Sequence, residues 1–400
     1  MPPKKLKNSQ ATNIATAAAV AACEDLMLCV LARLPVKSII RFKSVCKSWD
    51  HLLSTQEFVK KQFKLSKESK KQSFLVHRVN RNRSNIISVF NFESDEKKAK
   101  ILDYPFDYTP VGVGVGVGIG IGVSIVGCCN GLVCIKRGQE FVLWNPAMNL
   151  SKTVSNLKNR RDFEIVSLGF GYDAEVDDFK VVRIGFLEKM IRLRMRVSLV
   201  EVYSVNSDSW TTIDPGFQIS KLWFDWIDES ATVNGNPYWV GKVDVIKKEV
   251  LICFDMSKLV FKIVLLSSLD YKRAEHDIEF VDLNGSLGAL IVFDFFSRFW
   301  RQENEESDAY VNVWVFDDDE QIWTKSHSVG PIEVKIINRV FRCLNDGRVL
   351  GMNPKRQLIV FNSETKCVKG LFNDGHCFKI YDYTESLVYI QGMERGIRRN

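Results

Sequence analysis

The chain has 400 residues, 46% of them hydrophobic and 26% charged, a composition typical of a globular protein with two or three domains. Its formal net charge of +7 lies within residues 1–65, which hold 11 Lys and Arg against 4 Asp and Glu, so the remainder is neutral. This distribution argues against a nucleic-acid partner, because the excess charge does not cover a face of a large folded domain. No apolar run reaches the roughly eighteen residues that a membrane span requires, so we expect no membrane partner.

Ten cysteines are scattered along the chain, without a Cys-x-x-Cys pair and without a His-x-x-x-His pair. Zinc sites usually need such spacing, so we expect no metal and no other cofactor. Free thiols of this kind are typical of a reducing compartment. The sequence therefore predicts a cytoplasmic protein.

Residues 1–22 open with a short lysine cluster and continue into an alanine-rich run. Alanine is too weakly apolar for the middle of a signal peptide, and the segment lacks the arginine that transit peptides carry. We expect a disordered tail. Lys4, Lys5 and Lys7 leave nuclear import open as an additional destination.

Residues 23–63 carry two stripes of apolar side chains at helical spacing, separated by Pro35. Proline ends one helix and suits the first turn of the next, so the segment predicts a helical hairpin within a three-helix module. A module of this size cannot bury all of its Leu, Ile and Trp side chains, because small domains bury a low fraction of their surface. Part of the apolar surface is therefore expected to meet a partner.

The helical module closely resembles the F-box of plant F-box proteins. The resemblance is carried by Arg33-Leu34-Pro35-Val36-Lys37-Ser38, Arg41-Phe42-Lys43 and Val45-Cys46-Lys47-Ser48-Trp49. It departs at the start, where Ala22-Cys23 stand in place of the usual Leu-Pro pair. It implies a Skp-type adaptor as partner and, through the adaptor, a cullin and RING scaffold. The alternative is a hairpin that only packs on the body of the protein.

Apolar residues of the module are the expected adaptor contacts, because a small helical hairpin has apolar side chains to spare and Trp is a frequent interface anchor. Two others, Phe42 and Leu52, are expected to pack internally. The predicted adaptor-binding residues are Leu26, Leu34, Pro35, Val36, Ile39, Ile40, Val45 and Trp49.

After a basic linker at residues 64–72, the apolar pattern changes to a period of two over residues 73–395, which predicts an all-β domain. Within it, residues 111–123 alternate Val or Ile with Gly. That spacing never satisfies the G-x-G-x-x-G fingerprint of a dinucleotide site. We expect a low-complexity loop there.

The β domain repeats a hairpin signal, mostly Asn-Gly or Asp-Gly, followed by an aromatic residue in a later strand. The aromatic markers Trp144, Tyr203, Phe254, Phe316 and Phe361 are 59, 51, 62 and 45 residues apart. A period near fifty predicts a β-propeller-like, kelch-like fold, with five units visible and residues 378–390 available to close the ring. With the helical module, the fold class is α+β multidomain. A pair of β-sandwiches is the alternative.

The β domain resembles the F-box-associated interaction domain of plants, and within that family the S-locus F-box-like group. The runs that carry the resemblance include Cys129-Asn130-Gly131-Leu132-Val133-Cys134, Leu143-Trp144-Asn145-Pro146-Ala147 and Leu168-Gly169-Phe170-Gly171-Tyr172-Asp173. Together, the two resemblances imply a non-catalytic receptor of an SCF-type ubiquitin ligase, which binds a target protein for ubiquitination and degradation. The S-locus likeness implies a ribonuclease target in pollen and a role in self-incompatibility.

Target binding is expected on loops at one end of the propeller, where concave surfaces form. Two charged segments are the candidates, and solvated loops are the alternative for both. Their residues are Lys189, Arg192, Arg194 and Arg196 in a basic segment, and Glu303, Glu305, Glu306 and Asp308 in an acidic one.

Catalytic and metal-binding patterns are weak. The five histidines are solitary, and the acidic run from Asp317 to Glu320 lacks the alternating ligands of a calcium loop, so we expect a hairpin turn there. Two other classes stay open. One is a free-standing propeller that binds a peptide or glycan and dimerises through its helices; the other is a propeller enzyme with clustered carboxylates or histidines in a central pocket.

Overall fold

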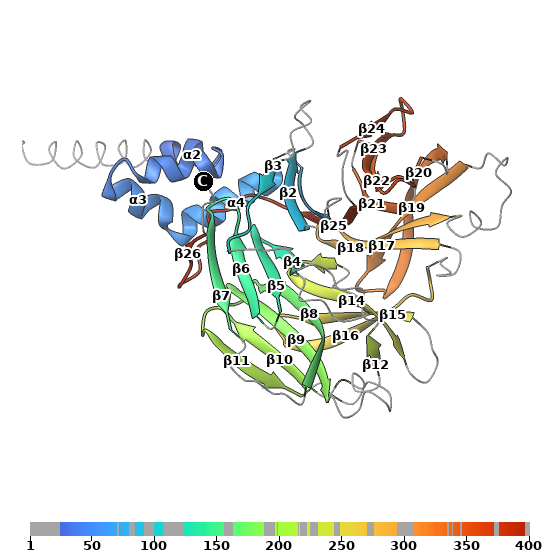
Figure 1. Ribbon diagram of the computed structural model, residues 1–400, viewed down its shortest axis with the longest axis horizontal. Helices are drawn as coiled ribbons and strands as arrows, with labels where there is room; N and C mark the ends of the chain where they lie inside the picture. The colour runs from blue at the N-terminus through green and yellow to red at the C-terminus, as the bar shows by residue number, and fades with distance from the viewer. Residues whose placement is uncertain are drawn as a thin grey trace, which may run out of the picture.

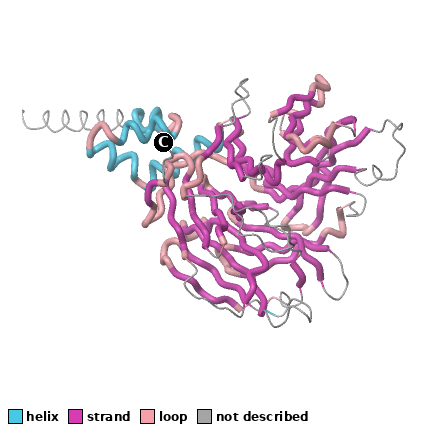
Figure 2. Tube along the Cα trace, in the orientation of Figure 1, coloured by secondary structure: helices cyan, strands magenta, loops and turns pink. Residues whose placement is uncertain are grey.

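The computed structural model of the protein shows a small helical module beside a ring of β-sheets (Figure 1). The helices gather at one end, and strands with the loops and turns between them make up the remainder of the described chain (Figure 2). The predicted tail and residues 111–122 of the Gly-rich run lie outside the described residues. The described ranges are 25–69, 72–79, 85–91, 100–106, 123–138, 140–155, 163–187, 197, 199–214, 216, 222–224, 231–243, 249–269, 276–293, 308–333, 336–337, 339–344, 346–371 and 376–396.

The helical module contains a helical segment at residues 25–31, then α2 (Val36–Lys43), α3 (Lys47–Ser54) and α4 (Gln56–Glu68). Pro35 is the N-cap of α2, with extended backbone angles, so the corner predicted at this proline is confirmed. Thr55 caps α4 by accepting a hydrogen bond from the Phe58 N–H at 3.3 Å. The described residues thus hold four helical segments where three were expected, and α4 continues into the segment expected to be a linker.

The β domain is a propeller of six antiparallel sheets, which confirms the predicted propeller fold and adds one blade to the five visible units. Blade 1 holds β1 (Ser73–Val79), β2 (Asn85–Asn91), β3 (Lys100–Leu102) and β25 (His376–Asp382). Blade 2 holds β4 (Val123–Cys129), β5 (Leu132–Arg137), β6 (Glu140–Asn145), β7 (Leu150–Val154) and β26 (Glu394–Arg395). Blade 3 holds β8 (Phe163–Asp173), β9 (Asp178–Leu187), β10 (Leu199–Ser204) and β11 (Ser209–Ile213).

The remaining three blades continue the ring in chain order. Blade 4 holds β12 (Leu222–Phe224), β13 (Ala231–Val233), β14 (Asn236–Val243), β15 (Glu249–Asp255) and β16 (Val260–Leu265). Blade 5 holds β17 (His276–Leu283), β18 (Ser286–Phe293), β19 (Asp308–Asp317) and β20 (Ile322–Glu333). Blade 6 holds β21 (Arg339–Cys343), β22 (Arg348–Met352), β23 (Leu358–Asn362) and β24 (Val368–Gly370).

The ring closes in blade 1, where β25 from the C-terminal region pairs with β1, the first strand of the domain. Partners in this pairing include Phe74 with Asp382 and Val76 with Ile380. After β25 the chain crosses to blade 2, and β26 adds to the outer strand β7. The predicted closure by residues 378–390 is therefore correct for β25.

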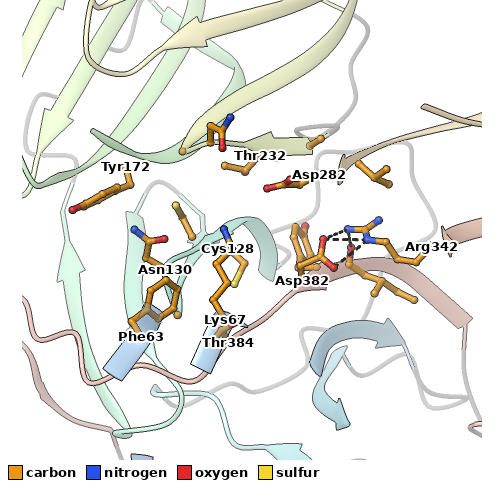
Figure 3. A pocket seen from close by; sticks show the side chains of 18 of the residues that line it. Phe63, Lys67, Cys128, Asn130, Tyr172, Thr232, Asp282, Arg342, Asp382 and Thr384 are labelled. Carbon is orange, nitrogen blue, oxygen red and sulfur yellow. Dashed lines mark hydrogen bonds and ion pairs between the residues drawn. The ribbon is translucent and has the colours of Figure 1, made fainter. Parts of the chain in front are cut away.

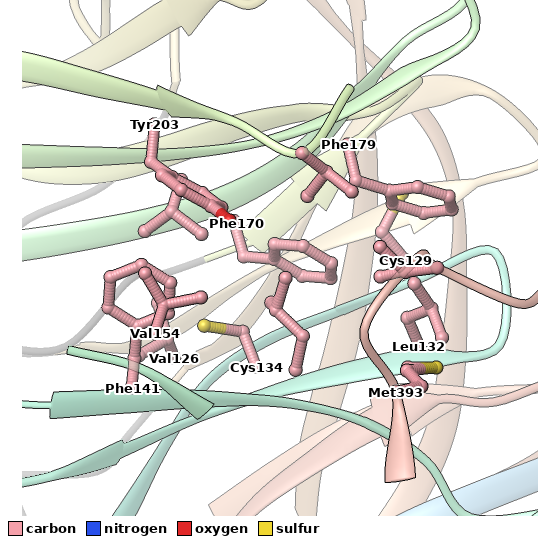
Figure 4. Packing of buried hydrophobic residues seen from close by; sticks show 14 residues of the cluster. Val126, Cys129, Leu132, Cys134, Phe141, Val154, Phe170, Phe179, Tyr203 and Met393 are labelled. Carbon is pink, nitrogen blue, oxygen red and sulfur yellow. The ribbon is translucent and has the colours of Figure 1, made fainter. Parts of the chain in front are cut away.

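Apolar side chains fill the space between each pair of neighbouring blades, six clusters for six blades. Figure 4 shows the cluster between blades 2 and 3, where the ring of Phe141 packs on Tyr203 and the ring of Phe170 stacks on Phe179. The five marker aromatics are all at most 4% exposed. Each marker lies in a different blade, so the distance between markers in the sequence corresponds to the length of chain that forms one blade.

Four of the five marker aromatics are followed directly by Asn or Asp, and this polar residue forms the same kind of turn in each blade. Its side-chain oxygen accepts hydrogen bonds from backbone N–H groups two and three positions later, which fixes the turn between the last two strands of a blade. These residues are Asn145, Asp255, Asp317 and Asn362. The acidic run at Asp317 is therefore a hairpin turn, as predicted.

The two ends of the propeller differ in their connections. Phe63 and Lys67 of α4 line the same pocket as Asn130, Ala174 and Asn234, which belong to the first hairpin turns of blades 2, 3 and 4. Short hairpin turns therefore face α4. Because the strands are antiparallel, the connections from β9 to β10 and from β18 to β19 start at the opposite end.

Candidate functional site

An exposed apolar patch lies on the helical module. Leu26 is 67% exposed, Val30 56% and Val45 65%. Pro35, which lies between Val30 and Val45 in the sequence, is also exposed. Scattered single apolar residues are normal on a protein surface, but three such side chains on one small module suggest an interface. We call Leu26, Val30, Pro35 and Val45 the apolar patch.

The predicted adaptor residues divide into three groups by burial. Leu26, Pro35 and Val45 are exposed, whereas Leu34, Ile40 and Trp49 are half-buried. Val36 and Ile39 are at most 1% exposed, because they pack in the core of the module with Leu53 and Phe58. Their side chains therefore do not face solvent.

Sequence reasoning missed some positions in this module. Val30 belongs to the same apolar stripe as Leu26, and its spacing was the signal that could have placed it in the patch. The predicted internal residues Phe42 and Leu52 are half-buried, and Phe42 packs on Trp49 with ring centroids 5.6 Å apart. The fully buried leucine of α3 is Leu53.

A segment from the C-terminal region joins the helical module to the propeller. We call residues 383–393 the strap. Its Leu387 is 1% exposed within the core of the helical module, although it is distant from that module in sequence. The strap is held by the fully buried Asn145, whose Nδ2 donates to the carbonyls of Ser386 at 3.0 Å and Val388 at 2.9 Å. Asn145 thus fixes both its own turn and the strap.

Helix α4 contacts the β8–β9 turn through Asp177. The Lys60 ammonium lies 2.8 Å from the Asp177 carboxylate, and Gln56 and Tyr172 donate hydrogen bonds to the same carboxylate. Burial alone would raise the pKa of Asp177, but the bonds from Lys60 and Tyr172 hold it below its ordinary value. Asp177 has a positive φ of 54°, which Asp and Asn tolerate better than most residues.

A pocket of about 510 Å³ lies at the axis of the propeller, beneath α4. Figure 3 shows Phe63 and Lys67 entering it from the helix, with Tyr172 on one wall and Asp282 on another. At one side, Arg342 forms an ion pair of 3.1 Å with Asp382. The innermost strand of every blade contributes to this pocket.

The predicted target-binding residues are mostly not described. Lys189, Arg192, Arg194 and Arg196 lie outside the described residues, as do Glu303, Glu305 and Glu306. Asp308 begins β19, where its backbone pairs with Glu333. Both segments belong to connections that start at the end of the propeller opposite α4.

The described ranges contain no group of three or more His, Cys, Asp or Glu residues placed to hold a metal ion. A search of the same ranges finds no helix long and apolar enough to cross a membrane.

Comparisons with known proteins agree with this architecture. Residues 23–61 match the F-box domain family, and residues 79–390 match the family described as F-box associated beta propeller domain. An F-box/kelch-repeat protein of Arabidopsis thaliana is 25% identical over 386 residues, which cover 92% of this chain and 94% of the relative. A putative F-box protein of the same plant is 24% identical over 251 residues, or 62% of this chain and 60% of the relative.

Among solved structures, TolB from Acinetobacter baumannii covers 78% of this chain and 66% of its own, with 8% identity and a TM-score of 0.43. A likeness this weak says nothing of function.

Proposed function

The chain belongs to the plant F-box proteins that carry an F-box associated β-propeller domain, and on this basis we propose that it is the substrate-recognition subunit of an SCF-type ubiquitin ligase. Its F-box docks a Skp-type adaptor, which connects it to a cullin and RING scaffold. Its propeller holds a target protein. The chain itself carries out no bond chemistry in this scheme.

The apolar patch is the observation that carries this proposal. Leu26, Val30 and Val45 are each more than half exposed, although they belong to a module whose other large apolar side chains are buried or half-buried. Other apolar side chains of the module are already covered, because they pack with Phe58 of α4 and with Leu387 of the strap. The patch is therefore the surface that remains for the adaptor.

Proximity is the mechanism that this arrangement supports. One domain docks on the ligase scaffold and the other holds the target, so the transfer of ubiquitin becomes effectively intramolecular. The ion pair between Lys60 and Asp177 and the strap bonds to Asn145 join the two domains. A target bound to the propeller is then held at a defined position relative to the adaptor.

Target binding is proposed at the end of the propeller opposite α4, on the connections that carry Lys189 to Arg196 and Glu303 to Asp308. Short hairpin turns and α4 occupy the other end, which supports this choice. Degradation as the outcome remains a prediction from the F-box resemblance, and a pollen ribonuclease as the target remains a prediction from the S-locus likeness. We propose that the protein works in the cytoplasm, with the nucleus as a second location.

Co-purification with a plant Skp-type adaptor tests the proposal. Wild type is compared with Val45→Asp in the patch and with Val260→Asp on β16, a control valine that is 46% exposed in the propeller. We expect wild type and the Val260 variant to form a one-to-one complex, and the Val45 variant to lose it while circular dichroism shows an unchanged fold. Failure of the folded wild type to bind would refute the receptor function and leave a free-standing binding protein.

A further inference from the structure

The pocket at the propeller axis has the size and position of a small-molecule site. Its volume of about 510 Å³ falls within the range of roughly 300–1,000 Å³ that is usual for ligand pockets. It is bounded by two parts of the protein, because α4 supplies Phe63 and Lys67 while the blades supply the remaining walls. A ligand in this pocket would therefore touch α4 and the propeller together.

Two of the charged groups at the pocket already satisfy each other. Arg342 pairs with Asp382 at 3.1 Å and also donates to the carbonyls of Phe341 at 2.7 Å and Ile380 at 3.2 Å. The Lys379 ammonium lies over the ring of Tyr381, 5.3 Å from its centroid. These groups shape one side of the pocket and are engaged with protein neighbours.

Two other charged groups are not paired. Lys67 on α4 and Asp282 on β17 both line the pocket, yet neither forms an ion pair with another side chain in the part of the chain that the structure describes. Among those residues, the Asp282 carboxylate accepts one hydrogen bond, from the Gly285 N–H of its own turn at 2.5 Å. Figure 3 shows the two side chains entering from opposite walls.

The burial of Asp282 disfavours its charged form. Burial raises the pKa of the Asp282 carboxyl above its ordinary value, although Lys67 and Arg342 act in the opposite direction. A half-buried carboxylate without a close cation is costly, and a ligand cation would relieve that cost. The Lys67 ammonium, in turn, offers donors to an anionic group.

We propose that the pocket binds a small zwitterion, a free α-amino acid or a short peptide, whose carboxylate contacts Lys67 and whose ammonium group contacts Asp282. Opposite charges on opposite walls match a ligand that carries both charges itself. The rings of Phe63 and Tyr172 provide apolar contact for its side chain. Because Lys67 belongs to α4, the helix that begins in the F-box, and Asp282 belongs to the propeller, the bound ligand links α4 to the propeller and stabilises their contact.

Isothermal titration calorimetry on the full-length protein tests this proposal, with the standard free L-amino acids and diglycine as probes. Each probe that binds is compared with two analogues of the same side chain, one without the amino group and one without the carboxyl group. We expect saturable binding of at least one zwitterion. Each analogue should bind at least about tenfold more weakly, because it leaves one charged protein group unpaired.

Matched variants locate the site. Lys67→Met and Asp282→Asn should each weaken binding at least about tenfold, whereas Lys64→Met on the same helix should bind as wild type, because Lys64 does not line the pocket. Hydrogen exchange of α4 should slow when the ligand binds wild type and stay unchanged for Lys67→Met. The titration needs no adaptor, so its result is independent of the receptor function.

Three results would overturn the zwitterion site. The first is that no amino acid and no diglycine binds the folded wild type saturably. The second is that the analogues bind as tightly as the zwitterion. The third is that Lys67→Met and Asp282→Asn leave the affinity unchanged.

Discussion

Lys60 of α4 and Asp177 of the β8–β9 turn form an ion pair of 2.8 Å that joins the F-box to the third blade. Both side chains are partly exposed, 56% for Lys60 and 27% for Asp177, so solvent screens the pair. Its role is therefore to orient α4 on the propeller, with a small effect on global stability.

Asp177→Asn tests this role, because Asn keeps the left-handed turn residue and removes the charge. We expect the free energy of unfolding to fall by about 0.5–1 kcal/mol, and hydrogen exchange of α4 to become faster. Asp208→Asn is the control. Asp208 also has a positive φ, accepts a bond from a tyrosine, Tyr203, and pairs with Lys152 at 2.8 Å, but it lies within the propeller. Equal exchange of α4 in both variants would contradict the orienting role.

Asn145→Ala should release the strap. The substitution removes two bonds to the strap carbonyls and two bonds from its own turn at a fully buried position, so we expect a loss of about 2–4 kcal/mol in the free energy of unfolding. Denaturant unfolding measures it. Asn362→Ala removes only the two turn bonds of the equivalent residue in blade 6 and should cost about 1 kcal/mol. Similar costs for both would mean that Asn145 does not hold the strap.

Gly131→Ala should displace the strap by steric overlap. Gly131 has a φ of +80°, and an added Cβ would lie 2.3 Å from Ser386 Oγ and 2.7 Å from the Thr384 carbonyl oxygen. Gly216 has a similar φ of +73° with no atom within 4 Å, so Gly216→Ala reports backbone strain alone, about 1–2 kcal/mol. We expect Gly131→Ala to lose clearly more stability than this control, and its C-terminal segment to become sensitive to protease. A loss of stability no larger than that of Gly216→Ala would show that the strap moves aside without a measurable cost.

Asp282→Asn should stabilise the protein near neutral pH. Because burial raises the pKa of Asp282, the folded state holds that proton more tightly than the unfolded chain does, and stability falls as pH rises through this interval. Asn removes the penalty and keeps an acceptor for the Gly285 N–H. We expect a higher melting temperature than wild type at pH 7.5, and a smaller difference near the unfolded pKa of about 4.

Asp255→Asn provides a control of opposite sign. Burial opposes ionisation of Asp255, but its bond to Lys262 and backbone N–H bonds hold its pKa below the ordinary value. Its contribution to stability is present above the unfolded pKa and is lost as pH falls through the folded value. The Asn variant should therefore melt at a lower temperature than wild type at pH 7.5. The same direction of change in both variants would contradict this account.

The blades could be predicted where each carries its own local markers. Asn130-Gly131, Asn234-Gly235 and Asn284-Gly285 have positive φ at both positions, as expected for tight hairpin turns between inner strands. The described residues of blade 1 hold no such pair, and its inner strand β25 comes from the other end of the domain. Local patterns do not predict a pairing between segments so distant in sequence, which is why the sequence indicates five units and the ring has six blades.

Which apolar residues of the helical module are exposed could be predicted only in part, for a related reason. Helical spacing shows that a face is apolar, but it does not say whether that face meets the domain's own core or a partner. Val36 and Ile39 face inward because the module packs around Leu387, which lies near the opposite end of the chain. Lys67 and Asp282 could not be brought together from sequence at all, because their approach depends on how α4 lies across the ring.

Closure of the ring by β25 and packing of Leu387 in the F-box have a consequence for synthesis on the ribosome. The F-box is translated before the propeller, yet one side of its core is completed by Leu387, which is translated only after β25. A chain that stops before residue 376 lacks the inner strand of blade 1, the strap and the Leu387 contact together. Such a truncated product would expose apolar surface on both domains at once. Chaperones and proteases would then recognise both domains as misfolded, so the truncated chain would not persist as a folded F-box attached to a defective propeller.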